Sequence, residues 1–173
     1  SDWTLTDQTV AAFASYTGPY QTSLQLNMPR DIVFYQGVRY EFARPNFAAG
    51  IKPASGLNIQ VIGRWGGGVD FANNRKATSA LQFGPQVDYN PLSQLSIRLS
   101  YNFDQLSVEQ GRLYRARLTQ LRMLYHLNVR TFVRAIVQYT DITRDPSLYV
   151  FGVDGRSRTL FLQCLFSYKL NPQ

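Results

Sequence analysis

Hydrophobic and polar residues alternate one by one along much of this chain. In the clearest run, 95–106 (LSIRLSYNFDQL), nearly every second residue is aliphatic or aromatic and most residues between are polar or charged. Successive side chains of a β-strand point to opposite faces of a sheet. The run therefore predicts a strand with one apolar and one polar face, and it is long enough to cross a lipid bilayer at a tilt.

The same alternation recurs along the chain, and no segment shows a sustained helical period. Clusters of turn residues separate the alternating runs. We predict nine strands, at residues 3–16, 20–28, 38–52, 57–65, 76–90, 95–106, 111–126, 129–139 and 159–170. The predicted fold class is all-β: a single domain over residues 1–173 that forms an antiparallel, up-and-down transmembrane β-barrel or part of a larger one.

The predicted connections fall into two alternating sets. Short turns are expected at 18–19, 52–56, 90–94 and 127–128, and mostly longer polar or glycine-rich loops at 29–37, 66–75, 107–110 and 140–158. Short turns on one side and long loops on the other are typical of bacterial outer-membrane barrels, in which the long loops face the cell exterior. The glycine-rich segment 66–75 is thus interpreted as an external loop tip.

Two predicted strands break the alternation. In 111–126 the apolar positions change phase, and a β-bulge near Thr119–Gln120 would restore a continuous apolar face. In 38–52, Pro45 separates two apolar stretches, and a proline inside a strand requires a bulge or an edge. Both breaks weaken the barrel pattern without removing it.

Composition supports a membrane-facing sheet. Aromatic residues make up 14% of the chain and charged residues 17%, below the ~25% typical of soluble domains. No apolar run is long enough for a transmembrane helix. Several tyrosines and tryptophans fall near predicted strand ends, where aromatic girdles lie in barrels, among them Trp3, Trp65, Tyr89, Tyr125 and Tyr139.

Arginine dominates the positive charge. The net charge is +7, and 15 of the 18 basic residues are arginines. They are spread along strands instead of being clustered in a tail or helix, which argues against nucleic-acid binding. We predict that seven of them face a lumen because a guanidinium is costly in lipid: Arg64, Arg98, Arg115, Arg117, Arg122, Arg130 and Arg134.

Two interpretations of these arginines stay open. They could form a passage or binding surface for an anionic solute, such as an acidic saccharide. Alternatively, they could be structural and pair with Asp88, Asp104 and Glu109. The chain contains only 11 acidic residues, so not every arginine can find an internal partner.

No motif predicts catalysis, a cofactor or a metal site. His126 is the only histidine, and no serine or acidic residue near it in the sequence suggests a catalytic triad. The single cysteine, Cys164, excludes an internal disulfide and a cysteine-based zinc site, and we interpret it as a small residue of the sheet wall. We expect a non-enzymatic protein without cofactors or metal.

Four segments resemble one protein family: 69–75 (VDFANNR), 111–116 (GRLYRA), 130–140 (RTFVRAIVQYT) and 165–173 (LFSYKLNPQ). It is a domain-of-unknown-function family of Gram-negative outer-membrane proteins in which an N-terminal carbohydrate-binding-like domain precedes a C-terminal β-barrel. The resemblance covers about residues 45–173, and its last segment is the most specific. It implies that this chain is part of a larger barrel, completed by other strands or chains, and it transfers no catalytic residue.

The resulting prediction is an outer-membrane barrel in contact with outer-membrane lipid. It would pass or bind a solute, anionic or saccharide, along its arginines. A soluble β-sandwich or lipocalin-like binding module is the alternative, with the apolar face turned inward. The strands are longer than the ~5–6 residues usual in soluble sheets, and seven arginines do not fit a soluble core.

Overall fold

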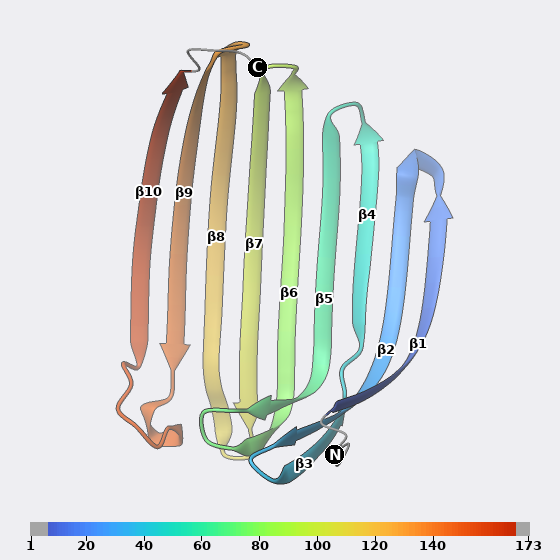
Figure 1. Cartoon of the computed structure of the whole chain (residues 1–173), viewed down its shortest axis with the longest axis vertical. Coiled ribbons are helices and arrows are strands. Elements are labelled where there is room, and N and C mark those ends of the chain that lie inside the picture. Colours follow the sequence, from blue (N-terminus) through green and yellow to red (C-terminus); the bar gives the residue numbers. More distant parts are fainter. Residues whose placement is uncertain (1–6, 169–173) are drawn as a thin grey trace, which may run out of the picture.

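The computed structural model describes residues 7–168, which form one antiparallel sheet of ten strands (Figure 1). The strands are β1 (Asp7–Gly18), β2 (Thr22–Tyr35), β3 (Val38–Ala43), β4 (Asn46–Ala54), β5 (Leu57–Asp70), β6 (Arg75–Leu92), β7 (Leu95–Val108), β8 (Gly111–Asn128), β9 (Thr131–Arg144) and β10 (Arg156–Tyr168). Two short 3-10 helices, η1 (Pro19–Gln21) and η2 (Pro146–Leu148), lie in connections. The all-β, up-and-down fold class is confirmed.

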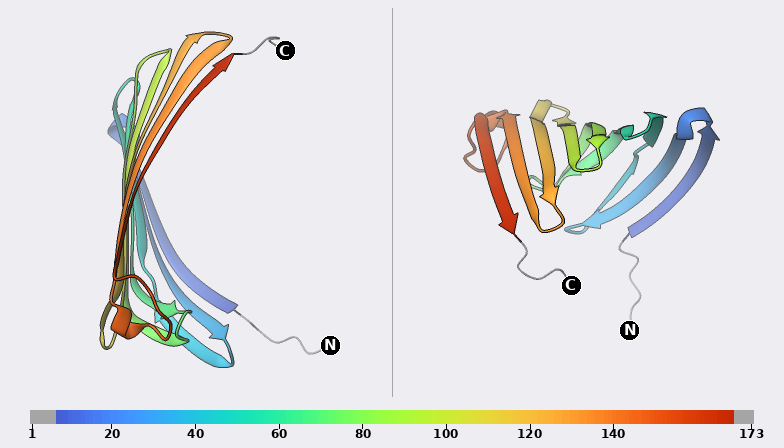
Figure 2. Two further views of the ribbon diagram at one scale, coloured as in Figure 1. Left: turned by 90° about the vertical axis from the view of Figure 1, so that its left-hand side faces the viewer. Right: turned by 90° about the horizontal axis from the view of Figure 1, so that it is seen from above.

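The sheet follows the order of the chain. Its order is β1-β2-β4-β5-β6-β7-β8-β9-β10, and β3 pairs with β2 beside this path. The first half of β2 pairs with β4, whereas its second half, from Arg30 to Tyr35, pairs with β3. The sheet curves strongly but stays open, with β1 and β10 at its two edges (Figure 2).

Strand register aligns the apolar residues of neighbouring strands on one face. Leu99 of β7, for example, lies opposite Val87 of β6 and Leu121 of β8, and Leu121 lies opposite Val137 of β9. We call this the apolar face. Its members include Tyr16, Leu24, Leu26, Phe47, Ile51, Ile59, Val61, Trp65, Leu81, Phe83, Val87, Tyr89, Ile97, Leu99, Tyr101, Leu121, Met123, Tyr125, Val137, Tyr139, Leu160, Leu162, Cys164 and Phe166.

The opposite face, which we call the polar face, carries mostly hydrogen-bonding side chains. They include Ser23, Gln25, Asn27, Asn46, Asn58, Gln60, Arg64, Gln82, Gln86, Asp88, Arg98, Ser100, Asn102, Asp104, Gln120, Arg122, Arg134, Gln138 and Gln163. The end of β5 folds over this face, because a Cβ added at Gly68 would lie 3.5 Å from Ala80 Cβ and 3.6 Å from Leu106 Cδ1. The end of β5 turns toward the hollow side of the sheet, so the polar face is the concave one (Figure 2).

The small buried core lies at one end of the sheet and not along its faces. Tyr40 and Phe42 of β3 and Val69 of β5 form its centre, and Val33 and Tyr35 of β2 pack against them. Along the middle of the sheet the apolar side chains stay largely uncovered: Leu99 is 48% exposed, Met123 40% and Leu162 65%. No second layer covers either face within the described part of the chain.

Three consecutive glycines allow β5 to bend over β3. A Cβ at Gly66 would lie 2.2 Å from the carbonyl oxygen of Ala43, and one at Gly67 would lie 2.5 Å from Phe42 Cβ. Gly66 also has a φ of +129°, a conformation that L side chains rarely adopt. The prediction that residues 66–68 form a loop tip is therefore wrong. They form a bulged part of β5, and the turn itself spans 71–74.

The predicted strand count needs one correction. Residues 38–52 form two strands, because the chain breaks at Arg44–Pro45 and then changes its pairing from the second half of β2 to the first. The break follows from Pro45, which has no N–H to donate; its carbonyl oxygen accepts instead from the N–H of Trp65 (3.0 Å). The described residues thus contain ten strands where nine were predicted.

The expected bulge near Thr119–Gln120 is also wrong. Register between β7 and β8 runs without interruption from Tyr114 to Tyr125, and the shift occurs at Leu113 instead. Leu113 is 2% exposed, because the bulge turns its side chain inward at the start of β8. Consequently Tyr114, Ala116 and Leu118 lie on the polar face, while the alternate residues Arg115 and Arg117 lie on the apolar face.

The two ends of the sheet differ less in loop length than predicted. Short connections at 19–21, 55–56, 93–94 and 129–130 confirm one set. At the other end β2, β5, β7 and β9 run several residues beyond their predicted ends, so the turns there shrink to 36–37, 71–74 and 109–110. Only 145–155 is a long connection, and we call this end of the sheet the loop end.

Some predictions fall outside the described residues. These are the girdle position of Trp3, the predicted strand residues 3–6 and 169–170, and the end of the 165–173 segment that carries the family resemblance. Within residues 7–168, no helix has the length and hydrophobicity needed to cross a membrane.

Candidate functional site

A row of polar side chains crosses four strands of the concave face. Asn46 of β4 lies opposite Arg64 of β5, which lies opposite Gln82 of β6, and Gln82 lies opposite Asp104 of β7. We call these four residues the polar row. Opposed positions on neighbouring strands hold their side chains within contact distance of each other. The row therefore presents amide, guanidinium and carboxylate groups side by side.

A hollow of about 450 Å³ lies over the polar row. Small residues of the next row, Ala48 and Gly84, form part of its floor beside Ile62 and Asn102. A Cβ at Gly84 would lie 3.1 Å from Ile62 Cγ1 and 3.2 Å from Asn102 Oδ1, so even an alanine there would be tight. The hollow thus combines a low apolar floor with a border of hydrogen-bonding groups, an arrangement that suits a small polar solute.

A second group of charges lies on the same face, outside the hollow and nearer the turns at 93–94 and 129–130. Arg98 of β7 stands directly opposite Arg122 of β8, and Arg134 of β9 lies two residues from the position opposite Arg122. We call these three arginines the basic strip. Like charges directly opposite each other destabilise a sheet unless an anion compensates them.

Internal acids compensate the polar face only in part. Asp88 accepts from Arg98 and, at 2.8 Å, from Gln86 Nε2. Asp104 accepts a hydrogen bond from the Tyr114 hydroxyl (3.1 Å). Arg64 and Arg122 form no ion pair with any described residue. The purely structural interpretation of the arginines therefore holds for Arg98 and does not extend to these two.

Arg134 adds an orphaned polar atom to the same face. Its Nε is buried and has no hydrogen-bond partner among the described residues. A buried donor without an acceptor is costly, by roughly 1–3 kcal/mol. The basic strip thus holds the unpaired charge of Arg122 and, in Arg134, a buried donor without an acceptor.

The structure places only four of the seven predicted arginines on one face. Arg64, Arg98, Arg122 and Arg134 lie on the polar face, as predicted. Arg115 and Arg117 do not, because the register places them on the apolar face in line with Gln105 and Phe103. Arg130 lies in the exposed turn between β8 and β9, where it faces neither side of the sheet.

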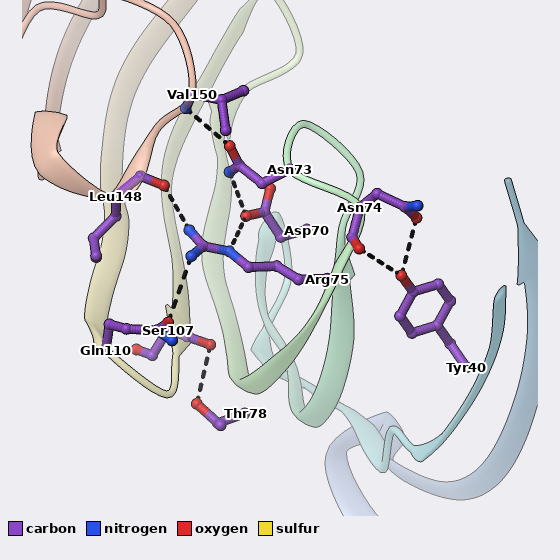
Figure 3. Close-up of polar contacts among 10 residues, drawn as sticks. All are labelled: Tyr40, Asp70, Asn73, Asn74, Arg75, Thr78, Ser107, Gln110, Leu148 and Val150. Atoms are coloured by element: carbon purple, nitrogen blue, oxygen red, sulfur yellow. Dashed lines mark hydrogen bonds and ion pairs between the residues drawn. The ribbon is translucent and has the colours of Figure 1, made fainter.

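A polar network fastens the loops at the loop end (Figure 3). Asp70, 2% exposed, accepts from Arg75 Nε (2.9 Å) and from Asn73 Nδ2 (2.6 Å). Arg75 also donates to the carbonyl of Leu148 (2.6 Å) and to Gln110 Oε1 (3.4 Å). The backbone N–H of Val150 donates to Asn73 Oδ1 (3.1 Å). Three connections are therefore tied together around one buried carboxylate.

The β2–β3 hairpin joins the same network. The Tyr40 hydroxyl lies 2.8 Å from the carbonyl oxygen of Asn74 and 2.9 Å from its Oδ1 (Figure 3). In the long connection, Tyr149 packs edge-on against Phe151. Burial raises the pKa of the Tyr149 hydroxyl above its ordinary value, and the negative charge of Asp70 adds to this effect. These contacts make the loop end an ordered rim.

The described residues show no arrangement typical of an active site. His126 lies at the end of β8, with its ring 5.8 Å from that of Phe132. Within residues 7–168, no three histidine, cysteine or acidic side chains lie close enough together to hold a metal ion. The chemistry that the concave face offers is hydrogen bonding and charge.

Sequence reasoning missed the uncharged part of this site. Asn46, Gln82 and Asn102 were not singled out as candidates, because an amide gives no signal of function in a single sequence. Asn46 and Gln82 share a row with Arg64 and Asp104, and Asn102 lies in the next row, only because of the exact register of four strands, which alternation alone does not define.

Comparison of the chain with family models, with curated proteins and with solved structures gives no match.

Proposed function

We propose that this sheet is part of the wall of a non-enzymatic β-barrel in a Gram-negative outer membrane. In this proposal the apolar face contacts lipid and the polar face lines a water-filled lumen. The observation that carries it is the separation of side chains between the faces along β4 to β10, in a single layer whose faces, among the described residues, are uncovered away from the loop end.

The energetics of the apolar face support a lipid environment. Burying a side chain such as leucine or phenylalanine is worth about 1.5–3 kcal/mol. The face holds Leu81, Phe83, Leu99, Leu162 and Phe166, each at least 40% exposed, along with many similar residues. In water these side chains would stay exposed and this free energy would not be gained. In the hydrocarbon of a bilayer they would be removed from water, and it would be gained. Six strands of 13–18 residues also match or exceed the 9–11 residues that cross a bilayer.

The soluble alternative requires a different partner for each face. A sandwich would need a second sheet over the apolar face, and a lipocalin-like cup would turn that face inward. Here the concave face is the polar one, with Arg64 and Arg122 on it. Curvature therefore favours the barrel wall over the lipocalin-like module.

The two edges of the sheet require partner strands to close a barrel. β1 and β10 each have one side without a partner strand among the described residues. In hydrocarbon such an edge is costly because no water can satisfy its backbone groups. We propose that further strands, from the same chain or from a partner chain, pair with β1 and β10, as the family resemblance also implies.

The proposed function is passage or surface binding of an anionic or saccharide solute. The polar row and the basic strip, counted with Asp88, the ion-pair partner of Arg98, hold four arginines and two acids, which leaves a charge of +4 − 2 = +2. Amides beside arginines are suited to hydroxyl and carboxylate groups. The preference for saccharides rests on the resemblance, and the preference for anions on the charge.

The first test is fractionation of the protein from its native source. We expect it in the outer-membrane fraction, extractable with detergent, and with a mobility in gel electrophoresis that changes on boiling. Solubility as a monomer without detergent would overturn the membrane proposal and favour the sandwich.

The second test addresses the solute. The extracted protein in planar bilayers should conduct with a preference for chloride over potassium, and Arg64→Gln with Arg122→Gln should weaken that preference. Removing the same charge at the end of the sheet opposite the loop end, with Lys52→Gln near the end of β4 and Arg130→Gln in the β8–β9 turn, is the matched control and should change it less. Equal effects of both pairs would contradict a role for the polar face.

A further inference from the structure

A second group of arginines lies on the apolar face of β8 and β10, beyond the last apolar row of these strands. That row consists of Tyr101, Thr119, Tyr139 and Leu160, which are opposite one another on β7, β8, β9 and β10. Toward the loop end, the face of β8, β9 and β10 changes from apolar to charged within two residues. There it carries what we call the outer cluster: Arg115, Arg117, Asp141, Arg156 and Arg158.

Strand register builds the outer cluster as two adjacent rows. In the first, Arg117 lies opposite Asp141, and Asp141 lies opposite Arg158. In the second, Arg115 and Arg156 lie on either side of Thr143. Four guanidinium groups thus surround a single carboxylate on three neighbouring strands.

The contacts within the cluster leave donors free. Arg156 donates to both oxygens of Asp141, at 3.1 and 2.8 Å, while Arg158 Nε lies 3.7 Å from Asp141 Oδ1. Arg115 donates to Gln105 Oε1 at 3.0 Å, and its guanidinium lies 5.8 Å from the centre of the Phe103 ring. The side chains of Arg156 and Arg158 remain 52% and 54% exposed. The charge of the cluster is +4 − 1 = +3.

The location of the cluster suggests its ligand. On a lipid-facing surface an arginine is costly at mid-depth and nearly free of cost at the interface, where phosphate groups lie. These arginines begin one row past Tyr139, on the face we assign to lipid. A guanidinium matches a phosphate through paired hydrogen bonds and stays charged at every relevant pH.

We propose that the outer cluster binds the phosphate groups of anionic lipids in the leaflet next to the loop end. This inference rests on the proposed function, because only a membrane-spanning sheet places the apolar face at that depth. Arg156 and Arg158 supply the exposed donors, Arg115 and Arg117 add charge beside them, and Asp141 keeps the guanidinium groups aligned.

The test is a titration of the detergent-extracted protein with lipid A, a phosphorylated outer-leaflet glycolipid, followed by native mass spectrometry. Replacing Arg156 and Arg158 together by glutamine should weaken lipid A binding about tenfold, because two charged donors are lost. Dephosphorylated lipid A should bind wild-type protein and variant alike. Lys52→Gln with Arg130→Gln, which removes equal charge at the opposite end, should bind lipid A like the wild type.

Three results would overturn this inference. One is an equal loss in the control variant, which would reduce the effect to net charge. Another is unchanged binding of lipid A by the Arg156 and Arg158 variant. The third is binding of inorganic phosphate, or of an acidic peptide, as tight as that of lipid A, which would assign the cluster to a soluble ligand.

Failure of the inference can be separated from failure of the proposed function. Each variant is first checked for boiling-dependent mobility, which reports a folded barrel. If the mobility shift is present but lipid A binding ignores the phosphates, only the assignment of the outer cluster fails. If the wild-type protein shows no shift and needs no detergent, the membrane proposal itself fails.

Discussion

At the scale of single residues, buried polar groups are few and concentrated at the loop end. Asp31 is 7% exposed and accepts from Thr9 Oγ1 (2.9 Å) and Arg44 (2.9 Å), which ties β1 and the break before β4 to β2. Asp70 likewise ties the end of β5 to the long connection, through Arg75. A sheet without a second layer has little other buried material, so these carboxylates fix the rim.

Replacing Asp70 by asparagine should therefore destabilise the loop end. The change removes the charge that Arg75 faces and leaves its guanidinium largely enclosed, at a cost of about 2 kcal/mol in the free energy of unfolding. Urea titration of the detergent-solubilised protein measures this difference. Asp154→Asn, at an exposed position of the long connection 145–155, should have almost no effect. Equal stability of the Asp70 variant and wild type would contradict the role of the network.

At the scale of the strand, one-residue alternation decides which environment each side chain meets. Leu99 and Ser100 are neighbours in β7, yet they lie opposite Val87 and Gln86 respectively. Leu99 thus belongs to the apolar face and Ser100 to the polar face. Two substitutions at adjacent positions can test this assignment with one and the same new residue.

Leu99→Arg should destabilise insertion into lipid vesicles by about 2–4 kcal/mol, since the guanidinium would lie far from either end of the apolar face. Ser100→Arg should cost far less, because its side chain would enter the water-filled side. Urea-dependent folding into vesicles, followed by boiling-dependent mobility, gives both values. A larger loss for Ser100→Arg would mean that the two faces are assigned the wrong way round.

Alternation also marks how far the sequence predicts the structure. It predicted the fold class, most strands and the faces of β7, because these depend only on neighbouring residues. It failed in β8, where the bulge expected at Thr119–Gln120 is absent, so the unbroken alternation up to Tyr125 places Arg115 and Arg117 on the apolar face. It also failed at 66–68. Three consecutive glycines are typical of a loop, but here they allow the backbone of β5 to approach β3 closely.

The candidate site was predictable only in its arginines. Arg64, Arg98, Arg122 and Arg134 were found from the cost of a guanidinium in lipid. The row formed by Asn46, Gln82 and Asp104 required the register between β4, β5, β6 and β7, which is a property of pairing and not of any one segment. The hollow beside Gly84 likewise depends on residues from four strands.

At the scale of the whole molecule, a single curved layer presents two faces of different chemistry. The concave side holds the polar row and the basic strip, and the loops bend over one end of it (Figure 2). The convex side holds a broad apolar area that ends in the outer cluster. Every functional proposal made for this chain depends on the convex side contacting lipid.

Cys164 offers a direct measurement of that claim. It is the only cysteine, it is exposed, and it lies opposite Ala135 on the apolar face, whereas its neighbour Gln163 lies opposite Ile136 on the polar face. A fluorophore can be attached to Cys164 in the protein reconstituted into vesicles. Moving the label by one residue, with Cys164→Ser and Gln163→Cys, provides the matched control.

We predict that nitroxide-labelled phospholipids quench the fluorophore at Cys164, while aqueous iodide does not. At position 163 the order should reverse, because that side chain faces the water-filled side. Iodide quenching at Cys164 without quenching by the lipid nitroxide, in protein that keeps its boiling-dependent mobility, would contradict the account, since the apolar face would then not contact lipid.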